Sequence, residues 1–97
     1  MTAVETARDI LDPEKLNLPP NIPVLRIETE AYTDVDGEDS LRVNVIISDD
    51  TVVEKVGGQN WVKLRMAIHD RLRDQGVSLF PYIFIAKPSE LAEADEE

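Results

Sequence analysis

Hydrophobic and polar residues alternate with a period of two along two neighbouring segments, residues 24–33 and 41–48. Such alternation is typical of a strand with one buried face. Residues 34–39 join the two segments and contain Asp36-Gly37, a dipeptide that favours tight turns because glycine adopts positive φ at no steric cost. The pattern predicts a β-hairpin. The side chains expected to face its core are Leu25, Ile27, Thr29, Ala31, Leu41, Val43, Val45 and Ile47.

The opposite face of this predicted hairpin is mostly polar, with Arg26, Glu28, Glu30, Arg42 and Asn44. Tyr32 and Ile46 are the two apolar positions on it. Because a helix packed on a sheet covers only one face, the polar face is expected to be solvated. Tyr32 and Ile46 then need cover from a partner or from the N-terminal residues.

A different period follows in residues 60–75. Apolar residues recur there at helical spacing, as expected for a helix with one buried stripe: Trp61, Leu64, Ile68 and Leu72. Asn60 is a candidate N-cap, and Gly76 stands where a helix-terminating glycine is expected. Residues 49–58 combine valines with Gly57-Gly58, which predicts a turn, with a short third strand as the alternative.

The last predicted strand, residues 79–86, is apolar on both faces. This is typical of a central or doubly covered strand, although Pro81 favours an edge because proline has no N–H to donate. The order strand, strand, helix, strand predicts an α+β fold. We expect a small, mostly antiparallel sheet of three or four strands with one main helix packed on one face.

Both ends of the chain differ in pattern from the compact domain expected over residues 24–87. Residues 1–23 combine a weakly helical stretch with four prolines between positions 12 and 23, which predicts an extended arm. Leu16 and Leu18 could anchor this arm on a surface. Residues 88–97 carry five acids and no base, which predicts an unstructured acidic tail.

Charge narrows the range of partners. Twenty Asp and Glu against ten Lys and Arg give a net charge of -10 and a pI of about 4.4. Nucleic acids and anionic membranes attract basic proteins, so neither is expected to bind, whereas a basic protein would be attracted. The chain has no cysteine, no signal-peptide pattern and no apolar run long enough to cross a bilayer, which predicts a cytoplasmic protein.

No arrangement of residues predicts catalysis or metal binding. The acids of residues 34–39 surround Gly37, but aligning Gly37 with the glycine of a calcium-binding loop puts Tyr32 and Val43 at ligand positions. His69 is the only histidine, and local spacing provides no nucleophile for it to activate. We therefore expect a non-enzymatic protein without metal, cofactor or small-molecule substrate.

These features predict a protein–protein interaction module, which would associate with itself, for example as a homodimer, or bind a larger, basic partner. The candidate contact residues are apolar positions of the sheet and arm: Tyr32, Ile46, Pro81, Tyr82, Phe84, Leu16 and Leu18. One alternative is an RNA-binding module that uses the basic face of helix 60–75, with Lys63, Arg65, Arg71 and Arg73. A second alternative is an acidic inhibitor or antitoxin-like partner of a toxin or nuclease.

Overall fold

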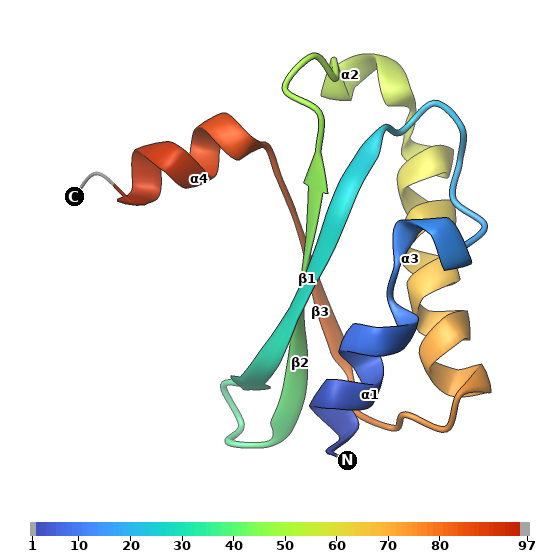
Figure 1. Ribbon diagram of the computed structural model, residues 1–97, viewed down its shortest axis with the longest axis vertical. Coiled ribbons are helices and arrows are strands. Elements are labelled where there is room, and N and C mark those ends of the chain that lie inside the picture. The colour runs from blue at the N-terminus through green and yellow to red at the C-terminus, as the bar shows by residue number, and fades with distance from the viewer. Residues whose placement is uncertain (1, 96–97) are drawn as a thin grey trace.

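The computed structural model describes residues 2–95, and for residues 92–95 it describes the backbone alone. Its elements, in chain order, are α1 (Ala3–Ile10), the short 3-10 helix η1 (Pro13–Lys15), β1 (Val24–Thr33), β2 (Asp39–Ile47), α2 (Val53–Val56), α3 (Gly58–Asp74), β3 (Pro81–Ala86) and α4 (Pro88–Asp95). Figure 1 shows the three strands crossing the molecule with α1 and α3 to one side. The predicted α+β fold, a hairpin followed by a helix and a strand, is confirmed.

The sheet has the strand order β1-β2-β3, so β2 is central. β1 and β2 form the predicted antiparallel hairpin, whereas β2 and β3 run parallel, which makes the three-stranded sheet mixed. A parallel neighbour requires a crossover connection, and α2 and α3 lie in that connection. The alternative of a further strand within residues 49–58 is wrong, because part of this segment forms α2.

β3 lies at an edge of the sheet, so the prediction of a central or doubly covered strand is wrong. Its apolar residues divide between the two faces. Ile83 and Ile85 pack against the core, whereas Tyr82 and Phe84 point to the opposite face, where Phe84 is 40% exposed. Pro81 was the informative residue, since β3 begins there and an edge strand tolerates a missing N–H donor.

The hydrophobic core fills the space between the sheet and α3. It combines one face of β2 with the predicted stripe of α3, in the buried set Leu41, Val43, Val45, Ile47, Leu64, Ile68 and Leu72. The N-terminal residues belong to the same core, because Ala7, Leu11 and Ile22 are also buried in it. A helix as short as α1 is marginal by itself in water, so this packing is what stabilises it.

A β-bulge changes the predicted pattern at the start of β1. The register shifts between Val24 and Arg26, so that Val24 pairs with Ile47 and Arg26 pairs with Ile46. Leu25 is left outside the ladder and is 55% exposed, although alternation predicts that it faces the core. Ala31 is likewise exposed near the end of the strand.

Helix α3 begins at Gly58, so the prediction of Asn60 as its N-cap is wrong. The N-cap is Gly57, whose φ of 89° and ψ of 137° suit glycine, since it has no Cβ. Asn60 lies within the first turn instead, and its side-chain Nδ2 donates to the carbonyl oxygen of Val56 at 2.7 Å. At the other end, Gly76 has the positive φ of 77° expected of a terminating glycine.

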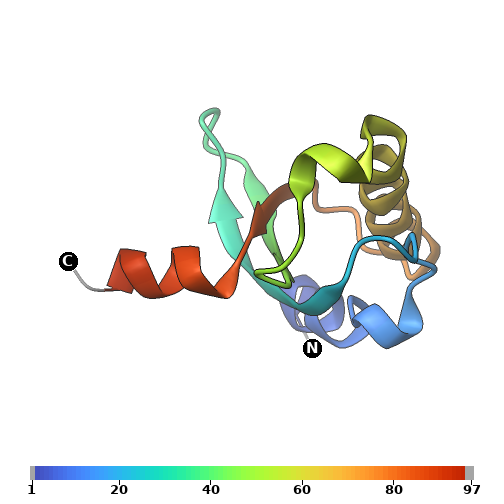
Figure 2. The same cartoon turned by 90° about the horizontal axis from the view of Figure 1, so that it is seen from above.

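The segment predicted to be an unstructured tail forms helix α4, up to Asp95. Glu96 and Glu97 lie outside the described residues. Pro88 is the first helical residue and Glu90 lies in the first turn. Proline at the first position and an acid in the first turn both favour the start of a helix. α4 extends away from the sheet on the side opposite α1 and α3 (Figures 1 and 2).

None of the helices within residues 2–95 combines the length and apolar character that crossing a membrane requires.

Candidate interaction surface

One face of the sheet lies opposite α1 and α3 (Figure 2). Side chains alternate along a strand, so the strand register determines which residues point to this face. We call it the open face, and its residues are Arg26, Glu28, Glu30, Tyr32, Ser40, Arg42, Asn44, Ile46, Tyr82, Phe84 and Ala86. The main helices α1 and α3 do not cover it.

Aromatic side chains gather along β3 and the end of β1. The ring centroids of Tyr32 and Tyr82 are 5.3 Å apart, and those of Phe80 and Tyr82 are 5.0 Å apart, at tilted or edge-on angles that favour aromatic contact. Phe84 follows Tyr82 on the same face of β3. These four residues, Tyr32, Phe80, Tyr82 and Phe84, form what we call the aromatic row. Phe80 is 56% exposed, so the row is accessible to a partner.

The centre of the open face contains paired charges. The Arg42 guanidinium lies over the Phe84 ring at 4.5 Å from its centroid, in a cation–π contact. The same guanidinium donates to Asn44 at 3.2 Å and lies 3.6 Å from the Glu30 carboxylate. All these groups are partly exposed, and exposed ion pairs contribute only about 0–1 kcal/mol each. They balance the charge of the face more than they stabilise the fold.

The hairpin turn places an acidic group at one end of the aromatic row. Four acids and no base lie in it: Asp34, Asp36, Glu38 and Asp39. The Asp34 Oδ1 accepts the backbone N–H groups of Asp36 and Glu38 at 2.9 and 3.0 Å. Its Oδ2 accepts the Tyr82 hydroxyl at 3.2 Å. The aromatic row and the acidic turn are therefore one continuous surface.

These contacts change the acidity of both partners. The backbone N–H of Glu38 lowers the pKa of Asp34, against the opposing effect of burial, and the Asp36 N–H and Tyr82 hydroxyl lower it further. Burial and then the charge of Asp34 raise the pKa of Tyr82. Asp34 therefore keeps its negative charge, and Tyr82 its hydroxyl proton, across the neutral range.

A cavity of about 470 Å³ lies at this end of the sheet, on the α1 side rather than on the open face. Apolar residues of α1 and of the segment before β3 form part of its wall, and Asp39 is the acidic residue in it. The lining residues are Ala3, Val4, Ala31, Tyr32, Thr33, Asp39, Ser40 and Leu79.

The structure brings together only some of the predicted contact residues. Tyr32, Tyr82 and Phe84 meet on the open face. Ile46 points to the same face but is fully buried, so it offers no contact area. Pro81 is buried on the core side of β3.

Leu16 and Leu18, the remaining two predicted contact residues, pack against the core as part of the arm. The sequence did not predict Arg42, Phe80 or Asp34 as contact residues. Arg42 and Phe84 become neighbours only through the parallel register of β2 and β3.

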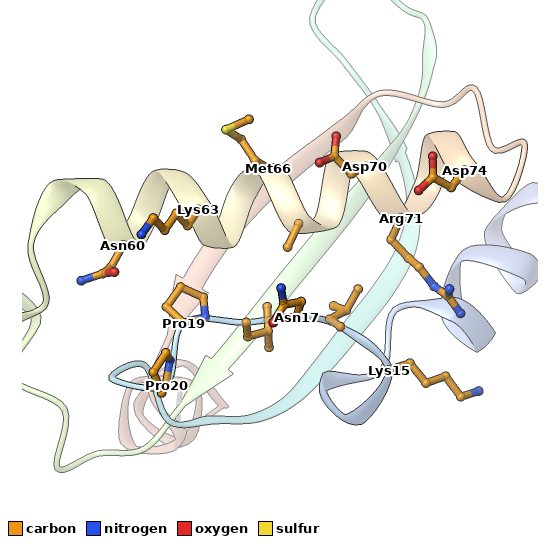
Figure 3. A pocket seen from close by; sticks show the side chains of 13 residues that line it. Lys15, Asn17, Pro19, Pro20, Asn60, Lys63, Met66, Asp70, Arg71 and Asp74 are labelled. Carbon is orange, nitrogen blue, oxygen red and sulfur yellow. The ribbon is translucent and has the colours of Figure 1, made fainter.

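A second depression separates the Pro-rich arm from α3 (Figure 3). It has a volume of about 530 Å³, and both Lys63 and Arg71 line it together with Asp70 and Asp74. Met66, although it borders the depression, points away from the arm. Basic and acidic side chains are mixed along this groove, so its electrostatic potential is neither uniformly positive nor uniformly negative.

The four basic residues of the RNA-binding alternative do not form one surface. Arg65 donates to the Ile83 carbonyl oxygen at 3.4 Å, on the β3 side of α3. Arg71 donates to the Ile10 carbonyl oxygen at 3.2 Å, on the α1 side. Arg73 pairs with Asp70 at 2.8 Å, and Lys63 lies in the arm groove. Nothing in this arrangement favours a phosphate backbone.

His69 is exposed on α3, and its ring lies 5.6 Å from the Phe80 ring. Within residues 2–95, excluding the side chains of 92–95, no three His, Asp or Glu side chains are arranged to hold a metal ion. Comparisons with protein-family models, curated proteins and solved structures give no significant match to this chain. The chemistry of the open face is therefore the basis for a functional proposal.

Proposed function

We propose that this chain is a non-enzymatic protein-interaction module that binds a basic segment of a partner protein on its open face. The observation that carries the proposal is the continuous surface formed by the aromatic row and the acidic turn. Exposed aromatic rings beside carboxylates suit arginine and lysine side chains, since the ring attracts the cation and the carboxylate neutralises it. A cytoplasmic location, suited to a chain without cysteine, is part of the proposal.

Arg42 illustrates the contact that a partner residue would make. Its guanidinium lies over Phe84 while the Glu30 carboxylate lies 3.6 Å from it. The Tyr82 ring contacts Tyr32, and its hydroxyl donates to the Asp34 carboxylate, but no cation of this chain lies over either ring in the described contacts. A basic side chain of the partner can take that position.

The net charge of -10 supports the same partner chemistry at long range. Opposite charges accelerate encounter, and the acceleration decreases as salt screens it. The inhibitor or antitoxin-like alternative is the special case in which the basic partner is a toxin or nuclease. It uses the same surface and predicts the same contacts.

The test is a titration of the isotope-labelled protein with an arginine-rich peptide, followed residue by residue by NMR. We expect shifts to concentrate at the aromatic row and the acidic turn, and affinity to decrease as salt is raised. Tyr82→Ala should weaken binding by about two- to fivefold, since an exposed cation–π contact contributes about 0.5–1 kcal/mol.

A matched pair of variants separates site binding from general attraction to an acidic protein. Asp36→Asn removes one carboxylate from the acidic turn, and Glu14→Gln removes one from η1, where Glu14 is also exposed. Only Asp36→Asn should weaken binding appreciably. Equal effects of the two variants, or shifts spread evenly over the acidic surface, would contradict the proposal.

A further inference from the structure

The outer edge of β3 has backbone groups that no other strand uses within the described residues. The Leu41 N–H donates to the Phe80 carbonyl oxygen at 2.9 Å, which directs the backbone groups of Phe80, and of every second residue after it, toward β2. Ile83 and Ile85 therefore direct their N–H and C=O groups outward. The Ile83 carbonyl oxygen accepts a hydrogen bond from the Arg65 guanidinium at 3.4 Å, which agrees with its pointing away from β2.

The two edges of the sheet differ in how they resist pairing with another chain. β1 has charged side chains at Arg26, Glu28 and Glu30 and a bulge at Leu25, features that discourage further strand pairing. β3 has no charged residue from Pro81 to Ala86. Three exposed apolar residues lie near this edge. Phe84 is in β3 and Phe80 directly precedes it, while Val62 lies on the side of α3 that carries Arg65.

We propose that two copies of this chain pair through their β3 edges, in antiparallel orientation about a two-fold axis at Phe84. In this register Ile83 faces Ile85 of the second copy, and the outward groups of both residues form four backbone hydrogen bonds. The Phe84 rings of the two copies then approach each other, as side chains do at a pair without hydrogen bonds. The product is a continuous six-stranded sheet with the two open faces side by side.

The β3 edge is the part of the sheet where charge least opposes a second copy. Each chain has a net charge of -10, so two copies can associate only where their carboxylates stay apart. The β3 edge meets this condition, because its own residues are uncharged and Arg65 and His69 lie beside it on α3. A basic segment would instead be drawn to the acidic turn. Salt should therefore strengthen the dimer, whereas it weakens binding of a basic segment.

Arg65 covers the edge in the monomer. Its guanidinium occupies the Ile83 carbonyl oxygen, one of the acceptors that the second copy requires. Dimerisation must displace this contact. Arg65→Ala should therefore tighten the dimer by about two- to tenfold, the range expected from one exposed hydrogen bond.

The test is the molar mass of the full chain by sedimentation over a range of concentrations at low and high salt. We expect a monomer–dimer equilibrium that shifts toward the dimer at high salt. Phe84→Lys should leave a folded monomer, because it places two positive charges at the two-fold axis. Val35→Lys adds the same charge in the hairpin turn, where Val35 is fully exposed, and should leave the dimer intact.

Hydrogen exchange identifies the interface independently of these variants. The Ile83 and Ile85 amides should exchange more slowly as concentration rises, while those of Tyr82 and Phe84 are protected by β2 at every concentration. A monomer at all concentrations and salts, or a dimer whose Ile83 and Ile85 amides stay unprotected, would overturn the proposal. Because dimerisation does not rest on binding of a basic segment, either proposal can fail while the other holds.

Discussion

Asp34 is the side chain that connects the hairpin turn to the open face. One of its oxygens accepts two backbone N–H groups of the turn, and the other accepts the Tyr82 hydroxyl from β3. Asp34 lies in the turn between β1 and β2, and through Tyr82 it contacts β3, which is not hydrogen-bonded to β1. Asp34 positions both an acid and an aromatic ring of the proposed binding surface.

The lowered pKa of Asp34 predicts a specific loss of stability in acid. The carboxylate stabilises the fold fully above its unfolded pKa of about 3.9, and this contribution is lost as the pH falls through the lower folded value. Asp34→Asn keeps an acceptor oxygen but cannot titrate. In urea unfolding the wild type should be more stable than Asp34→Asn at pH 7, and the difference should decrease below pH 4. A difference that stays constant down to pH 2 would contradict the assignment.

Among the helices, the start of α3 depends on two adjacent glycines with different roles. Gly57 has φ of 89°, which a residue with a Cβ adopts only with strain, whereas Gly58 begins the helix and has open space around the position of a Cβ. The sequence alone treats Gly57-Gly58 as one flexible pair. The structure separates a required glycine from a replaceable one.

Alanine substitution distinguishes these roles. Gly57→Ala should lower the free energy of unfolding by about 1–3 kcal/mol because of backbone strain. Gly58→Ala should leave it unchanged or raise it by up to about 1 kcal/mol, since alanine favours the helix and restricts the unfolded chain. Chemical denaturation of both variants measures this. Equal effects at the two positions would show that the left-handed conformation of Gly57 is not needed.

The elements that the sequence predicted are those specified by local patterns. Alternation in residues 41–47 and helical spacing from Trp61 to Leu72 each depend on neighbouring residues, and both elements are present. The apolar run of β3 did not predict its edge position, because such runs are typical of buried strands; the only local signal for an edge was Pro81. The bulge at Leu25 left no signal either, since leucine fits the alternation.

Part of the candidate surface was predictable for the same reason. The alternation in β1 predicts that Tyr32 points to the open face. The contact between Arg42 and Phe84 instead depends on the parallel pairing of β2 with β3, two strands that are far apart in the sequence. The proximity of Asp34 to Tyr82 likewise depends on β3 lying beside β2. Long-range pairing, which no local pattern encodes, assembles the aromatic row.

At the scale of the whole molecule, the two proposed interactions use different sides of one sheet and respond oppositely to salt. The open face and acidic turn would bind positive charge, and the β3 edge would pair uncharged backbone. A dimer would place two open faces next to each other and would present a basic partner with two adjacent binding surfaces. Linked surfaces raise the apparent affinity for a partner with repeated basic segments.

The parallel pairing also determines the order in which the fold can assemble. The β1–β2 ladder closes a short turn, whereas Leu41 meets Pro81 about 40 residues later, at a larger cost in loop entropy. We expect the hairpin to be largely formed in the folding transition state and β3 to join afterwards. Ile27→Val should then slow folding, whereas Ile83→Val should mainly accelerate unfolding, as stopped-flow kinetics would show. Equal effects of both variants on the folding rate would contradict this order.

Late arrival of β3 means that β2 spends part of every folding event as an exposed edge. Its Leu41, Val43 and Val45 are among the most buried residues of the finished protein. During that interval they are open to any other unfinished chain, since exposed apolar surface and an unpaired strand edge make a partly folded species prone to aggregate. At high protein concentration the yield of refolding should therefore be limited by how quickly the crossover closes.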